Sequence, residues 1–146
     1  VNFKGMLLGF KKQFAGPILD GTKIFTIREK RKVEPKIGET LHMYSGLRTK
    51  HTELISKEHT LTGIQLVDIA ISEDRSVKPF IKWVTVYVDE RQLSNTELNV
   101  LAVSDGFTDL NDFCNFWLKG GKPDENKWVV VLKKDLVMHH WTDFRF

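Results

Sequence analysis

The chain has 146 residues, of which 41% are hydrophobic and 28% are charged, with a formal net charge of +3. This composition is typical of an ordinary globular protein with one core, and it excludes a disordered chain. No apolar run approaches the ~20 residues of a membrane helix, and no secretory signal pattern is present, so we expect one cytoplasmic domain spanning residues 1–146 and no membrane association.

Positive charge is concentrated in the first third of the chain. Residues 1–50 carry a net charge of +7, and the remaining residues carry −4. Clustered positive charge raises the local concentration of phosphates, so this asymmetry indicates an anionic partner. A solvated basic face is an equally good explanation of the run at residues 30–32.

The first half of the chain combines strand, turn and loop signals. We expect strands at residues 3–10, 23–29 and 41–44, a short helix at residues 11–20 and a polar surface loop at residues 48–61. Gly21 is expected to end the helix in a left-handed conformation, because glycine adopts a positive φ without steric cost.

The second half predicts strands at residues 63–72, 83–88, 128–132 and 136–141, with a hairpin excursion at residues 74–78. Ser94 and Glu97 have the spacing of a capping box, which predicts a helix from there to Val103. Thr108 is expected to cap a second helix that places Cys114 on its buried face. About six strands and two or three short helices, without regular alternation, predict an α+β fold with a small, mostly antiparallel barrel or curled sheet.

The strand at residues 23–29 has the side chains best suited to bind or react with a ligand. Thr26 and Arg28 share one face because side chains in a strand alternate, whereas Lys23 joins them only if it lies in the turn after Gly21. An Arg fork, a Lys amine and a Thr hydroxyl suit a phosphate or an acyl carbonyl. The alternative is structural: a Thr in a cross-strand pair and a surface Arg.

Residues 21–28, GTKIFTIR, resemble the G-x-K-x-x-T-x-R signature of the ASCH domain family, relatives of the PUA-like RNA-binding barrels. Further pieces match the family in the same order: residues 18–20, 36–39, 46–50, 105–107 and 138–143. The resemblance covers nearly the whole chain. It implies a PUA-like β-barrel with a cleft facing the signature strand, which binds RNA or a modified nucleotide or nucleoside.

One branch of this family, the small bacterial acetylcytidine amidohydrolases, is similar in its catalytic groups. The resemblance implies Lys23 as base, Thr26 as nucleophile and Asp105 as proton donor, in a position where that branch has Glu. The leading hypothesis is therefore ligand binding, and the alternative is removal of an acyl group from an N-acylated cytidine-type nucleoside. Asp105 also fits a structural role, because Asp-Gly is a common turn pair.

Arg28, Arg48, Lys50 and Trp141 complete the expected site. The three cations are assigned to phosphate or base contacts, and Trp141 to stacking on a base. His139 and His140 are adjacent and face opposite ways on a strand, so we expect neither a metal site nor another cofactor. A protein-interaction domain without a ligand is the third hypothesis.

Overall fold

The computed structural model describes residues 5–146. Within these residues it has an α+β fold of three α-helices, one 3₁₀ helix and eight strands. In chain order the elements are β1 (Met6–Phe10), η1 (Lys12–Phe14), α1 (Ala15–Asp20), β2 (Phe25–Arg28), β3 (Leu41–Ser45), β4 (Glu53–Ser56), β5 (Gly63–Asp74), β6 (Ile81–Val88), β7 (Arg91–Gln92), α2 (Asn95–Ser104), α3 (Leu110–Leu118) and β8 (Trp128–His140).

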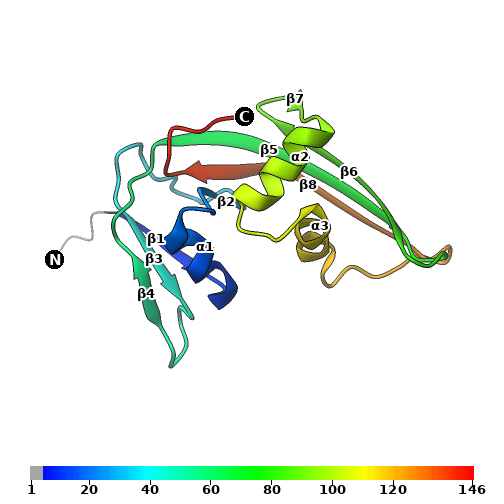
Figure 1. Cartoon of the computed structure of the whole chain (residues 1–146), viewed down its shortest axis with the longest axis horizontal. Helices are drawn as coiled ribbons and strands as arrows, with labels where there is room; N and C mark the ends of the chain where they lie inside the picture. Colours follow the sequence, from blue (N-terminus) through cyan, green and yellow to red (C-terminus); the bar gives the residue numbers. More distant parts are fainter. Residues whose placement is uncertain (1–4) are drawn as a thin grey trace.

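The strands form two sheets (Figure 1). The smaller sheet has the order β1-β3-β4, with β1 parallel to β3, and the larger antiparallel sheet has the order β2-β8-β5-β6-β7. The α+β class is therefore confirmed. Each sheet has an open strand order with two edge strands, so neither closes into a barrel within the described part of the chain, and the PUA-like barrel stays a prediction.

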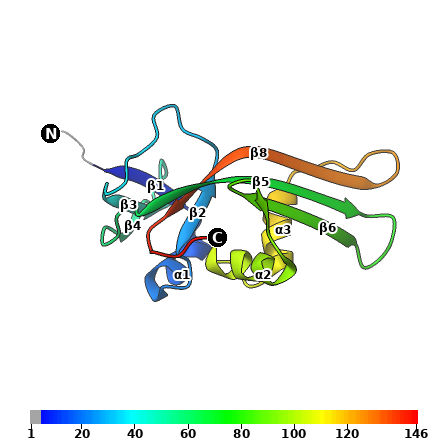
Figure 2. The ribbon, with the colours of Figure 1, turned by 90° about the horizontal axis from the view of Figure 1, so that it is seen from above.

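The long strands β5, β6 and β8 extend as an arm beyond α3, and the helices lie on one side of the larger sheet (Figure 2). Side chains of β5 alternate along the arm. Val67, Ile69 and Ile71 are buried in the core, whereas the residues between them are partly exposed. This alternation is typical of an antiparallel sheet with one face toward the core. None of the helices in residues 5–146 is long and apolar enough to cross a membrane.

Two turn signals in the sequence are confirmed. Gly21 has φ +85° and follows α1 as its left-handed cap. Ser94 and Glu97 form the expected capping box at the start of α2, with the Ser94 side chain accepting from Glu97 N. Both caps satisfy backbone groups that a helix end leaves without partners.

Other expectations were wrong in detail. The predicted loop at residues 48–61 contains β4, which pairs with β3 although its sequence is partly polar. The predicted helix at residues 11–20 begins as a 3₁₀ turn before α1. The cap of α3 is Asp109 rather than Thr108, because the Asp109 carboxylate accepts from Asp112 N at 2.9 Å. The predicted first strand begins at Met6, and residues 3 and 4 lie outside the described residues.

The two predicted C-terminal strands are one strand, β8. The gap expected between them, residues 133–135, lies inside the strand, where Asp135 forms an irregularity at φ +57°. Its backbone N–H donates to Asp68 Oδ1 at 2.8 Å, so a side chain of β5 replaces the lost ladder bond. The strand therefore continues through this point.

Candidate functional site

A cavity of about 260 Å³ opens beside β2, where the signature strand meets the end of β1 and the α2–α3 connection. The lining combines backbone, charged and aromatic groups from five parts of the chain. Its residues are Gly9, Phe10, Lys11, Phe14, Lys23, Thr26, Ile27, Arg28, Asp105, Phe107, Phe116 and Trp117. The structure therefore brings Lys23, Thr26, Arg28 and Asp105 to one pocket.

Lys23 reaches the pocket because it precedes β2 instead of belonging to it. Its backbone N–H donates to Pro17 O at 2.9 Å, which holds the turn after Gly21, so the alternation of the strand does not apply to it. Lys23 Nζ donates to Asp105 Oδ1 at 2.5 Å and to Asp105 O at 2.7 Å. The ion pair is deeply buried, with side chains 3% and 7% exposed.

Burial controls the protonation of this pair. Loss of water lowers the pKa of Lys23 and raises the pKa of Asp105, and each partner opposes the shift of the other. The Lys23 ammonium also lies 4.8 Å from the ring centroid of Phe14, which offers a cation–π contact. A buried Lys and Asp whose pKa values are shifted toward each other are a common feature of sites that transfer protons.

Thr26 and Arg28 share a face, as strand alternation predicts. Arg28 Nε donates to Thr26 Oγ1 at 3.2 Å, and its Nη2 donates to Gly9 O at 2.5 Å. Burial, followed by the charge of Arg31, lowers the pKa of Arg28 to about 10. Nη1 has no hydrogen-bond partner in residues 5–146, so one end of a fixed guanidinium can bind a ligand.

Aromatic side chains form the remaining wall of the pocket. Phe14 and Phe107 meet edge to face with ring centroids 5.3 Å apart, and Phe116 lies 5.4 Å from Phe107 and 5.6 Å from Trp117. The Trp117 indole N–H is buried and has no partner among the described residues. Apolar rings with a few converging donors are typical of a site for a planar organic ligand.

The aromatic wall and the Gly9 carbonyl were missing from the sequence-based site. Periodicity placed Trp117 on the buried face of α3 and so indicated a core residue, whereas Phe116 lies off that face and 37% of it is exposed. The rings gather from η1, α3 and the α2–α3 connection, and only the tertiary fold joins these segments. Phe107 was the one aromatic residue of the wall that the sequence placed near the site, because it directly follows the Asp105-Gly106 pair.

Three expected ligand-binding residues do not line the pocket. Arg48 and Lys50 are exposed in the β3–β4 connection. Trp141 is only 5% exposed, with Phe10 6.4 Å and His59 6.1 Å from its ring centroid. Its burial does not fit the expected stacking on a base, so Trp141 is a core residue.

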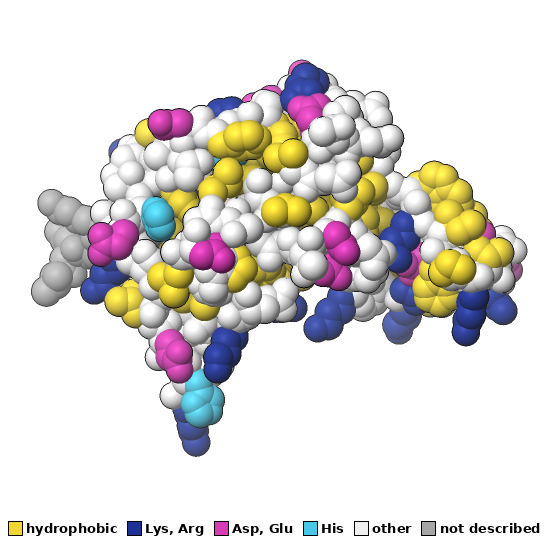
Figure 3. Space-filling model, viewed as in Figure 1, with side chains coloured by type: hydrophobic (Ala, Val, Ile, Leu, Met, Phe, Trp, Pro, Cys, Tyr) yellow, Lys and Arg dark blue, Asp and Glu magenta, His cyan; other side chains and the backbone are white. Residues whose placement is uncertain are grey.

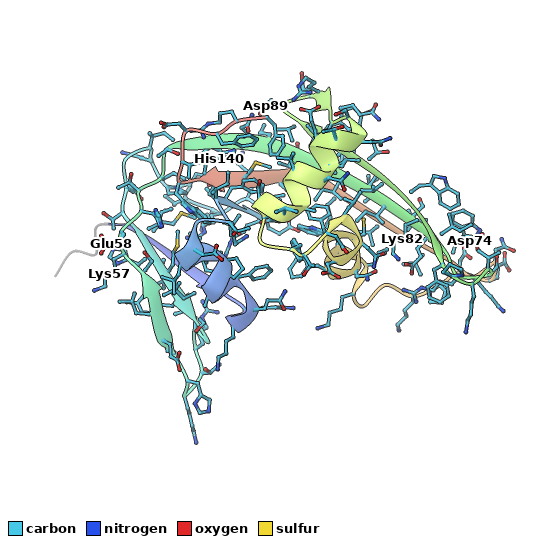
Figure 4. The ribbon with its side chains drawn as sticks, in the orientation of Figure 1. Lys57, Glu58, Asp74, Lys82, Asp89 and His140 are labelled. Atoms are coloured by element: carbon cyan, nitrogen blue, oxygen red, sulfur yellow. The ribbon has the colours of Figure 1, made fainter. Side chains whose placement is uncertain are left out.

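His139 and His140 contact different partners. His139 Nε2 lies 3.1 Å from Glu34 Oε2, and His140 Nε2 lies 3.0 Å from Gln65 Oε1. Figure 4 shows His140 inside the fold rather than at its surface. Burial lowers the pKa of His140 to about 4, so it is neutral at pH 7. No group of three His, Cys, Asp or Glu side chains in residues 5–146 has the arrangement of a metal site.

Cys114 is buried in the core, as expected. It is 2% exposed, and burial raises the pKa of its thiol to about 11. A thiol with this pKa is a poor nucleophile at neutral pH.

No family model, curated protein or solved structure matches the chain when it is compared with known proteins. The resemblance to the ASCH family therefore rests on the motifs quoted above.

Proposed function

We propose that the pocket binds the base and sugar of a nucleoside, either free or as part of a nucleotide or RNA. One observation carries this proposal. The Lys23–Asp105 pair, Thr26 and Arg28 line the same cavity as five aromatic rings. Every base has hydrogen-bonding edges and two flat faces, so rings and convergent polar groups complement it.

The size of the cavity favours one nucleoside. Pockets for drug-sized ligands usually have about 300–1,000 Å³, and the cavity has about 260 Å³. A strand of RNA is too large to enter, whereas a single unstacked base fits. The resemblance to the ASCH family, with its PUA-like barrel and nucleotide-like ligands, supports the same class of ligand.

Direct binding measurements test this proposal. We expect at least one of the four common ribonucleosides or N4-acetylcytidine to bind, as measured by titration calorimetry. Arg28→Met should weaken that binding at least 10-fold, because it removes the fixed guanidinium. Arg91→Met is the matched control, since Arg91 pairs with Glu97 on the surface, away from the pocket. If the whole panel fails to bind, the proposal is wrong.

A second candidate is an amidohydrolase that removes the acyl group from an N-acylated cytidine-type nucleoside. It is favoured by the Lys23–Asp105 pair, which lines the same pocket as Thr26. Burial lowers the pKa of Lys23 and raises the pKa of Asp105, which favours the amine that acts as base and the carboxylic acid that acts as proton donor. Thr26 Oγ1 accepts a hydrogen bond from Arg28 Nε, so the hydroxyl proton of Thr26 is not used in that bond and can be transferred to a base.

In this mechanism the Thr26 oxygen attacks the acyl carbonyl, and its proton passes to Lys23. The bond between the carbonyl carbon and nitrogen breaks as Asp105 gives a proton to the leaving amine. The acyl ester on Thr26 is then hydrolysed by water to the free acid and the original hydroxyl. Arg28 Nη1 offers a hydrogen bond to the oxyanion.

Turnover of N4-acetylcytidine tests the second candidate. Thr26→Val should lower kcat at least 100-fold and leave nucleoside binding within threefold, because Val retains the shape of Thr without the nucleophile. Asp105→Asn should also lower kcat. Wild-type protein that binds N4-acetylcytidine without releasing acetate would leave binding as the function and exclude the hydrolase.

A further inference from the structure

A second, more open cavity of about 610 Å³, here called the outer groove, lies next to the pocket. Gly9, Phe10 and Lys11 at the end of β1 line both cavities. The other lining residues of the outer groove are Lys12, Ser45, Gly46, Leu47, His51 and Glu53. A ligand that fills the pocket can therefore extend past Lys11 toward the β3–β4 hairpin.

Lys11 is an exposed residue that lines both cavities. Its Nζ is 5.0 Å from the ring centroid of Phe116, which also lines the pocket. No carboxylate pairs with Lys11 or Lys12 within residues 5–146. The outer groove is thus lined by two exposed lysines that have no counter-ion among the described residues.

The far side of the outer groove is also basic. His51 lines it, and Arg48 and Lys50 are exposed in the same hairpin connection. Figure 3 shows lysine or arginine side chains and a histidine at the tip of this hairpin. Glu53 is the only acidic residue in the lining, and no cation pairs with it among the described residues. The charge of the groove therefore favours an anion.

We propose that the outer groove holds a phosphate of the ligand, bound by Lys11 and Lys12, while the nucleoside part fills the pocket. This inference rests on the proposed nucleoside site. It makes the preferred ligand a nucleotide or a phosphodiester rather than a free nucleoside. Lys11 touches both cavities and is the residue that joins the two parts of the ligand.

Paired ligands test the phosphate site. The affinity of each panel nucleoside is compared with that of its 5′- and 3′-monophosphate at 50 and 200 mM salt. We expect at least one monophosphate to bind 10-fold more tightly than its nucleoside at 50 mM. This gain should shrink at 200 mM, because salt weakens phosphate contacts, whereas nucleoside binding should not change.

Two variants locate the phosphate. Lys12→Gln should reduce the gain at least threefold and leave nucleoside affinity within threefold, because Lys12 lines the outer groove and not the pocket. Lys32→Gln, a matched change of an exposed lysine outside the groove, should keep the gain. Glu53→Gln should strengthen monophosphate binding about two- to threefold, because it removes the only carboxylate of the groove.

The outcomes separate the two proposals. Nucleosides that bind as tightly as both of their monophosphates would overturn the phosphate site and leave the nucleoside site standing. A panel in which neither nucleosides nor monophosphates bind would overturn both. Equal affinities of Lys12→Gln and wild type for the monophosphate would also overturn the phosphate site. A dinucleotide that binds more tightly than the monophosphate supports it and identifies a strand as the ligand.

Discussion

The protein buries a carboxylate against a lysine in two regions, with different consequences. In the pocket, Lys23 is the only ion-pair partner of Asp105 among residues 5–146, and both side chains are almost completely buried. In the arm, the Glu73 side chain is only 3% exposed, but it lies closer to the surface than Asp105 and pairs with Arg75 at 2.6 Å and Lys82 at 3.1 Å. Figure 4 shows Lys82 toward the outer end of the arm.

The difference lies in the cations. Arg75 and Lys82 are 29% and 19% exposed, so they keep part of their hydration while they bond Glu73. Burial raises the pKa of Glu73, but the hydrogen bonds and charges of its two partners outweigh burial and lower it. Burial dominates at Asp105 and raises its pKa. The two cations in the arm therefore favour the charged form of Glu73, whereas burial opposes the charged forms of both Lys23 and Asp105.

Lys23→Met has the largest expected effect on stability. It leaves Asp105 buried without a cation, which typically costs about 3–5 kcal/mol in the free energy of unfolding. Lys82→Met is the matched change in the arm and should cost about 1–2 kcal/mol, because Glu73 retains Arg75. Urea unfolding at pH 7 measures both.

The double variant Lys23→Met with Asp105→Leu removes both charges and should recover most of the lost stability. Equal losses of unfolding free energy for Lys23→Met and Lys82→Met would show that Asp105 depends on its cation no more than Glu73 depends on Lys82.

Gly106→Ala should change both stability and ligand binding. Gly106 has φ +91°, and an added Cβ would lie 3.0 Å from Lys23 Cδ and Phe14 Cδ1. The positive φ alone costs about 1–2 kcal/mol for a residue with a side chain. We therefore expect lower stability and at least threefold weaker nucleoside binding, measured by urea unfolding and calorimetry.

Gly120→Ala is the control for Gly106→Ala. Gly120 has φ +83°, and its added Cβ would have no neighbour within 4 Å. It should lose about the same 1–2 kcal/mol and keep full ligand affinity. Unchanged binding in Gly106→Ala would mean that the position of Lys23 is not important for the ligand.

The two carboxylates predict opposite pH dependences. Glu73 has a lowered pKa, so its stabilising effect is complete above its unfolded pKa and is lost as the pH falls through its folded pKa. Glu73→Gln should therefore lose less stability than wild type between pH 5 and pH 3. In Lys23→Met, the raised pKa of Asp105 should make the protein more stable at pH 5 than at pH 7. Unfolding curves at each pH check both signs.

The smallest expected effect concerns α3. Lys82 Nζ donates to Asn111 Oδ1 at 2.9 Å, which ties β6 to the helix that carries Cys114. Asn111→Ala should speed the labelling of Cys114 by a thiol reagent about 2- to 12-fold, because one hydrogen bond contributes about 0.5–1.5 kcal/mol. Asn99→Ala, which affects a contact within α2 only, should leave the rate unchanged. Equal rates in both variants would contradict this role for Lys82.

Local patterns predicted much of the fold. Alternation predicted the common face of Thr26 and Arg28, and capping chemistry predicted the start of α2, because both depend on neighbours in sequence. Periodicity did not predict β8 as one strand, because the side chain that bridges its irregularity, Asp68, is 67 positions away from Asp135.

The candidate site was predicted in part. Lys23 depends on a turn, and its contact with Asp105 spans 82 positions, so alternation could not place it. The family resemblance supplied Asp105, and the structure brings it to Lys23. Arg48 and Lys50 lie in the β3–β4 hairpin connection, outside the pocket. The sequence contains no signal for how far this connection lies from β2.

The position of β8 in the chain has a consequence for synthesis. β8 follows every other strand, yet it lies between β2 and β5 in the larger sheet. Until β8 leaves the ribosome, β2 has no strand to pair with. The pocket beside β2 and the arm therefore both depend on the last strand to be synthesised. A chain that stops before Trp128 would expose one edge of β5 and both edges of β2, and we expect such a fragment to aggregate or be degraded.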